Sequence, residues 1–97
     1  MSVDDFFAPP PFKPDAALVQ LKRSLREMRP LVERGESFEL QGQAVLQLSA
    51  QGDHLQVRIA RKPARSPEWD TRQLRNAAEV RSFTDEVKRR LARWSEE

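Results

Sequence analysis

The sequence predicts a small α+β domain of two layers, in the order helix, strand, strand, strand, helix, with a three-stranded antiparallel sheet and both helices on one face. Its 97 residues suffice for one domain with a modest core. Two segments space their apolar residues three and four apart, and the segment between them alternates apolar and polar residues. We expect an extended tail over residues 1–14 and a single domain over residues 15–97.

The first helix is predicted to begin near Asp15, which follows Pro14 and is expected to be the N-cap. Apolar side chains then recur at helical spacing, at Leu18, Leu21, Leu25 and Met28. Two ends are compatible with the sequence. The helix either stops at residue 28 or 29, before Pro30, or continues with a kink to Arg34, where Gly35 is a natural stop.

Strands are predicted from residue 38 onward. Apolar residues occupy most even positions from Phe38 to Leu48, which is the period of a strand with one buried face. Gly42 marks either a bulge or bend in one long strand, or a break between two shorter strands. Residues 50–53 have turn composition, and residues 54–59 alternate again, which predicts an antiparallel hairpin. The polar residues expected on the uncovered face are Glu39, Gln41, Gln43, Gln47, Gln56 and Arg58.

Residues 61–68 read as a basic loop with two prolines, and the segment after it is ambiguous. A helix could begin at Ser66 and run to Trp94, with Pro67 at its first position. We favour a third strand over residues 68–74, because a two-stranded hairpin is marginally stable. Residues 76–79, Asn-Ala-Ala-Glu, also provide a capping box just before the next apolar stripe.

The last helix is predicted from residue 77 to residue 94. Its apolar stripe consists of Val80, Phe83, Val87, Leu91 and Trp94. Asp85 with Arg89, and Glu86 with Arg90, are spaced for favourable ion pairs along a helix.

Several classes of active site lack their residues. The chain has no cysteine, one histidine and three glycines, which excludes thiolate metal sites and the clustered glycines of phosphate-binding loops. His54 could act as a general base oriented by Asp53, but we favour an ordinary exposed histidine at a hairpin turn. We therefore expect no enzymatic activity, no metal and no cofactor.

The location is predicted to be cytoplasmic. No run of apolar residues is long enough to span a membrane, and the acidic start of the sequence is unlike a secretory signal. Thirteen of the 17 basic residues are arginine, which suggests a bacterial gene of high GC content.

Positive charge is concentrated in one segment. The net charge of the whole chain is +2, but residues 58–75 hold six basic and two acidic residues, so the remainder is slightly acidic. Such a segment could follow a phosphate backbone while a tryptophan stacks on a base. The candidate nucleic-acid-binding residues are Arg58, Arg61, Lys62, Arg65, Trp69, Arg72 and Arg75. The competing interpretation is a solvated loop rich in arginine.

The predicted element order over residues 15–94 resembles that of the double-stranded RNA-binding domain. Residues 52–54, Gly-Asp-His, are similar to the Gly-Pro-x-His loop of that family but lack its proline. The resemblance implies RNA contacts at the start of the last helix, where the family has lysines. This chain has Asn-Ala-Ala-Glu there, so an acid would face phosphate, and we do not assign it to the family.

The tail is the second candidate for binding. Residues 1–14 hold four prolines and three phenylalanines, Phe6, Phe7 and Phe12. These side chains either fold back over the domain or form a linear motif, since Pro11 and Pro14 fit the PxxP pattern. We expect a soluble protein-interaction or accessory module, monomeric or weakly dimeric, that contacts another protein through the tail or the sheet face rich in glutamine and arginine. The alternative is nucleic-acid binding through residues 58–75.

Overall fold

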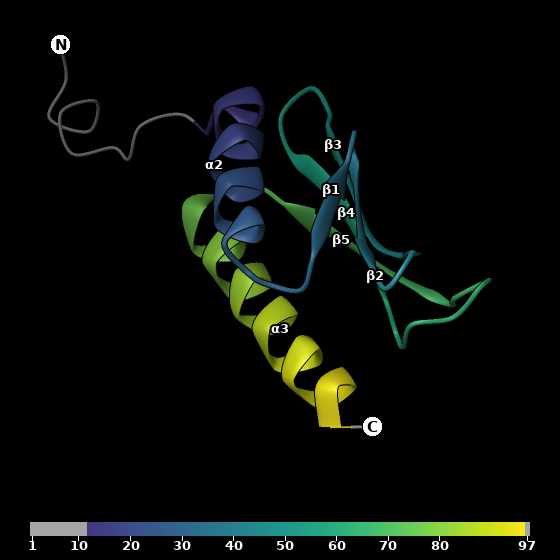
Figure 1. The fold of residues 1–97 in the computed structure, drawn as a ribbon. Helices are drawn as coiled ribbons and strands as arrows, with labels where there is room; N and C mark the ends of the chain where they lie inside the picture. Colours follow the sequence, from purple (N-terminus) through teal and green to yellow (C-terminus); the bar gives the residue numbers. More distant parts are fainter. Residues whose placement is uncertain (1–11, 97) are drawn as a thin grey trace, which may run out of the picture.

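The computed structural model describes residues 12–96, and it is an α+β fold with one antiparallel sheet. The elements are α2 (Pro14–Arg26), β1 (Val32–Arg34), β2 (Ser37–Leu40), β3 (Gln43–Ala50), β4 (Leu55–Ala60), β5 (Trp69–Leu74) and α3 (Ala77–Glu96). Neighbouring strands along the chain are neighbours in the sheet. Figure 1 shows α2 and α3 side by side on one face of the sheet. The α+β class is confirmed, but the sheet has five strands instead of the predicted three.

One additional strand is β1, which follows α2 after a short turn. The helix ends at Arg26 with Glu27 as its C-cap, two residues before the earlier of the predicted ends, and the alternative of a kinked continuation to Arg34 is wrong. Strand β1 has three residues, which are too few to show the alternation of a strand in the sequence. Gly35, with φ of 60°, lies in the turn that leads from β1 back into β2. A bidentate pair between Arg26 and Glu33, at 2.8 and 3.1 Å, ties the end of α2 to β1.

The start of α2 also differs from the prediction. Its N-cap is Lys13, with no side-chain hydrogen bond, and Asp15 lies in the first turn. The physical reason is Pro14, whose fixed φ suits the first helical position and shifts the start by one residue. Asp15 is still favourable there, because a carboxylate near a helix N-terminus interacts well with the helix dipole.

The second additional strand results from a break at Gly42. Gln41 and Gly42 have φ of 53° and 83°, the two positive values that a type I′ hairpin turn requires. The break between two shorter strands, one of the two interpretations of Gly42, is therefore confirmed.

A bulge interrupts the pairing of β2 with β3 near Val45, which the sequence did not indicate. Phe38 pairs with Leu46 and the next residue, Glu39, pairs with Ala44, so Val45 has no partner. Because a bulge shifts the alternation by one residue, Gln43 pairs with the buried Leu40 and Gln41 belongs to the turn. The prediction that Gln41 and Gln43 lie on the uncovered face is therefore wrong.

The remaining elements agree with the sequence. The hairpin of β3 and β4, the strand β5 and the helix α3 are confirmed. At the start of α3 the Glu79 N–H donates to Asn76 Oδ1 at 2.9 Å, and the Glu79 carboxylate accepts from the Arg75 N–H at 2.8 Å. Glu86 and Arg90 form the predicted pair at 2.7 Å, whereas in the described chain no ion pair joins Asp85 to Arg89.

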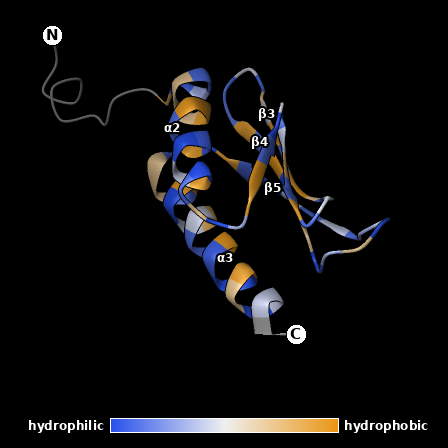
Figure 2. Ribbon diagram, in the orientation of Figure 1, coloured by the Kyte–Doolittle hydropathy of each residue, from blue (hydrophilic) through white to orange (hydrophobic). Residues whose placement is uncertain are grey.

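The core fills the space between the helices and the sheet. Figure 2 shows hydrophobic and hydrophilic residues interleaved along both helices, as expected for helices with one buried stripe. The buried stripes and strand faces include Leu21, Leu25, Phe38, Leu46, Leu55, Val57, Ile59, Phe83 and Val87. In residues 12–96 no helix is both long enough and apolar enough to cross a membrane.

Candidate binding face of the sheet

The face of the sheet that points away from the helices is predominantly polar. Strand pairing places Gln47, Arg58 and Thr71 in one row, and Ser49, Gln56 and Gln73 in the next. Cross-strand partners point to the same side, so these rows share one surface with Ser37, which pairs with Gln47, and Trp69, which pairs with Ala60. We call this surface the open face; it comprises Arg34, Ser37, Glu39, Gln47, Ser49, Gln56, Arg58, Trp69, Thr71 and Gln73. Glu39 was predicted on this face; it alternates with the buried Phe38 and Leu40, and it pairs with Arg34 at 3.6 Å.

Arg58 is the centre of the open face. Its guanidinium donates to the Gln47 side-chain oxygen at 3.1 Å and lies 5.0 Å from the centre of the Trp69 ring. That distance is within the range of a cation–π interaction. The Arg58 side chain is thus held by neighbours on both sides, from β3 and from β5.

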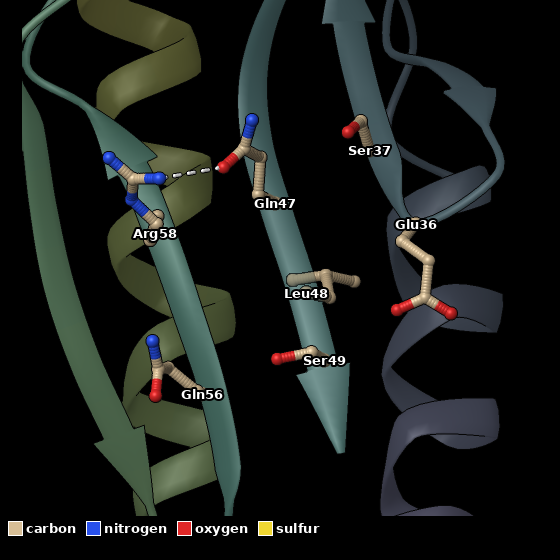
Figure 3. Close-up of a pocket in the computed structure, with 7 residues that line it drawn as sticks. All are labelled: Glu36, Ser37, Gln47, Leu48, Ser49, Gln56 and Arg58. Atoms are coloured by element: carbon tan, nitrogen blue, oxygen red, sulfur yellow. Dashed lines mark hydrogen bonds between the residues drawn. The ribbon is translucent and has the colours of Figure 1, made fainter. Parts of the chain in front are cut away.

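A shallow depression of about 270 Å³ lies beside this arginine. In Figure 3 the helices lie behind the strands, and the polar ends of Gln47, Ser49, Gln56 and Arg58 surround the depression. Its floor is the body of the sheet, and Glu36 and Ser37 form the far side. The depression offers amide and hydroxyl groups, one guanidinium and the Glu36 carboxylate.

The basic segment predicted for nucleic acid is divided between the two faces. Asp70 and Arg72 alternate with the open-face residues of β5 and pair with the buried Ile59 and Val57, so they face α3. Arg72 pairs with Glu86 at 3.2 Å, and Arg61 pairs with Asp70 and Glu68, each at 3.0 Å. Two of the predicted cations are therefore bound to acids of the same chain.

Arg90 completes this ion-pair network between β5 and α3. It binds Asp70 at 2.9 Å and Glu86 at 2.7 Å, and it donates to the Ala60 carbonyl at 2.9 Å. Hydrogen bonds from Arg90 and then Arg61 lower the pKa of Asp70 below its usual value. The composition of residues 58–75 could not reveal this, because Glu86 and Arg90 lie outside that segment.

The other predicted cations remain at the surface. Lys62 and Arg65 are exposed in the loop between β4 and β5, and no carboxylate of residues 12–95 forms a salt bridge with either. Arg75 is exposed at the end of β5 and donates to Gln73 at 2.7 Å. The structure therefore brings Arg58 and Trp69 together, and it leaves Lys62, Arg65 and Arg75 apart from the ion-pair network.

The prediction that His54 is exposed to water is wrong. Its side chain is 16% exposed and its Nδ1 is 2.8 Å from the Asp53 carboxylate, which lowers the pKa of Asp53. The other ring nitrogen, Nε2, is buried and has no hydrogen-bond partner in the described part of the chain. Nε2 is therefore not exposed to solvent in this arrangement.

Of the tail residues proposed for partner binding, Phe12 is described and packs against the core in a partly buried position. Phe6 and Phe7 lie outside the described residues. Across residues 12–95, no three side chains of His, Cys, Asp or Glu gather where they could hold a metal ion.

Sequence reasoning missed Arg34, Ser37, Thr71 and Gln73 as members of the open face. For β5 the signal was present, because residues 69–74 place Trp, Thr and Gln at alternate positions. Comparison with known proteins adds no member to this set: no family model matches the chain. No curated protein matches it, and no solved structure matches it either.

Proposed function

We propose that this chain is a non-enzymatic binding module that takes a protein partner on the open face of its sheet. The observation that carries the proposal is the Arg58–Trp69 pair at the centre of that face. Tryptophan and arginine are enriched among the residues that dominate binding energy at protein interfaces. Here they lie together, on strands of a sheet whose opposite face is covered by α2 and α3.

The pair is also organised before a partner arrives. Gln47 and Trp69 restrict Arg58 from two sides. Fixing a long side chain during binding costs about 0.5–1.5 kcal/mol, and restraint in the unbound protein reduces that cost. This favours Arg58 as an anchor over the exposed, unrestrained Lys62.

The surroundings of Arg58 indicate what kind of surface would fit. Glutamine, serine and threonine provide both donors and acceptors around the Arg58 guanidinium, and Glu36 adds a carboxylate on the far side of the depression. No carboxylate of residues 12–95 forms a salt bridge with Arg58. Such a surface complements a partner segment with backbone amides and one carboxylate, because arginine binds carboxylates through paired hydrogen bonds.

The test uses the absence of cysteine from the chain. Gln56→Cys on the open face and Lys88→Cys on α3 each receive a benzophenone photo-crosslinker and are added to an extract of the cells that make the protein. We expect protein adducts from the Gln56→Cys position that disappear with Trp69→Ala or Arg58→Gln and persist after nuclease treatment. Equal adducts from Lys88→Cys, or adducts unaffected by both substitutions, would contradict the proposal. Thermal midpoints verify that each variant is folded.

Nucleic acid is the second candidate, supported by exposed Lys62 and Arg65 on the loop that leads into Trp69. Since Arg61 and Arg72 are bound to acids, about four cations remain, and each phosphate contact contributes about 0.7–0.9 to the slope of log affinity against log salt. Titration of labelled RNA and DNA at two salt concentrations should then show a slope of about 3–4 at most. Lys62→Ala with Arg65→Ala should lower it, and absence of binding at low salt would exclude this candidate.

A further inference from the structure

A second surface lies on the helices, where the first turns of α2 and α3 leave a groove of about 1010 Å³. Apolar side chains form its interior: Phe12, Ala16, Ala17, Ala77 and Val80. We call it the N-terminal groove. It is separate from the open face, because both helices lie on the other side of the sheet.

The rim of the N-terminal groove is positively charged. It consists of Lys13, Arg75 and Arg81, and no acidic residue among residues 12–95 lines the groove. An apolar interior with a basic rim fits a segment that combines large apolar side chains with carboxylates. A second copy of the same groove would not fit, since two basic rims would repel each other.

The chain itself carries a segment of that chemistry at the groove. Residues 1–11 contain Asp4 and Asp5 directly before Phe6 and Phe7, and they have no basic side chain. The segment is attached at Phe12, which already lines the groove. We propose that the N-terminal groove binds this chain's own residues 4–7, with the phenylalanines against the apolar interior and the aspartates at the basic rim.

The length of the connection is sufficient. Phe7 is five residues from Phe12 and can reach about 17 Å from it, whereas packed helices lie about 8–10 Å apart. The prolines at positions 9–11 favour extended backbone, so the connection is long enough for Phe7 to contact either helix of the groove. A short tether also gives the segment an effective concentration of about millimolar at the groove, so weak contacts suffice to hold it against a competing partner.

The absence of cysteine again permits a clean test. A nitroxide on Gln20→Cys, at the groove, should remove most of the NMR signal from the amides of residues 4–7. The same label on Thr71→Cys, on the open face, should leave those signals unchanged. Arg81→Glu should restore the signals in the Gln20→Cys sample, whereas Arg93→Glu, near the other end of α3, should not.

Three results would overturn the proposal. The first is that the amide signals of residues 4–7 keep full intensity with the nitroxide on Gln20→Cys. The second is that these signals lose equal intensity with the nitroxide on Gln20→Cys and on Thr71→Cys. The third is a loss that appears only when labelled and unlabelled chains are mixed, which would place the segment on a second copy. Unchanged amide positions for the core residues serve as the check that each variant is folded.

Discussion

The two faces of the sheet use similar polar residues in different ways. On the helix-covered side, Asp70 and Arg72 of β5 are tied to Arg90 and Glu86 of α3 in a network whose side chains are 16–43% exposed. On the open face Arg58 has an amide and an aromatic ring as neighbours, and no carboxylate of residues 12–95 forms a salt bridge with it. A guanidinium bound to carboxylates has few donors left for a partner, whereas one bound to Gln47 and Trp69 keeps donors available. The comparison separates arginines that hold the fold from one suited to binding.

The largest expected difference between the faces is in packing. Phe38→Ala, on the covered face, should lower the free energy of unfolding by about 3–5 kcal/mol, because it removes a fully buried ring and leaves a cavity. Ser37→Ala, the preceding residue on the open face, should change it by less than about 0.5 kcal/mol. Urea denaturation measures both, and effects of similar size would show that the faces are not distinguished by burial.

The ion-pair network comes next. Arg90→Met removes three hydrogen-bonding contacts and should lower the free energy of unfolding by about 1–3 kcal/mol, since Asp70 and the Ala60 carbonyl lose a charged donor. Arg89→Met is the matched control. Arg89 is the residue next to Arg90, but its side chain is exposed and forms no ion pair with residues 12–95. Equal losses in the two variants would contradict a structural role for the network.

Acid should weaken the same network. Hydrogen bonds from Arg90 and Arg61 lower the pKa of Asp70 in the folded protein, so folding favours its charged form. This stabilisation is fully present above 3.8, the ordinary aspartate pKa, and is lost as pH falls below that value through the lowered folded-state pKa. Asp70→Asn should therefore flatten the acid limb of a plot of thermal midpoint against pH. Arg61→Ala should flatten it less, and identical limbs for Asp70→Asn and the unaltered chain would refute the assignment.

Most of the fold could be predicted from the sequence because its elements are long and periodic. The stripe of α3 and the alternation of β3 and β4 follow directly from burial on one side. Two features could not be predicted in this way. Strand β1 has three residues, too few for a period, and the bulge at Val45 depends on pairing between strands and leaves no composition signal.

The candidate site was predicted in part, and for a related reason. Charge counting grouped Arg58, Arg61 and Arg72 as one basic segment. Strand alternation places Arg58 on one face and Arg72 on the other. Arg61 forms ion pairs with Glu68 and Asp70 on the far side of the loop. A strand register was needed to assign the faces, and the position of α3 was needed to find the acids.

The smallest expected effect tests the open face most directly. A double-mutant cycle of Arg58→Ala and Trp69→Ala should give a coupling free energy of about 0.5–1 kcal/mol, as for a partly exposed cation–π pair. The same cycle with Arg72 in place of Arg58 should give none, because Arg72 lies on the other face. A coupling of zero between Arg58 and Trp69 would mean that the arginine is not held before binding. The open face would then have no advantage over the exposed loop as a binding surface, since the restraint of Arg58 is what distinguishes the two.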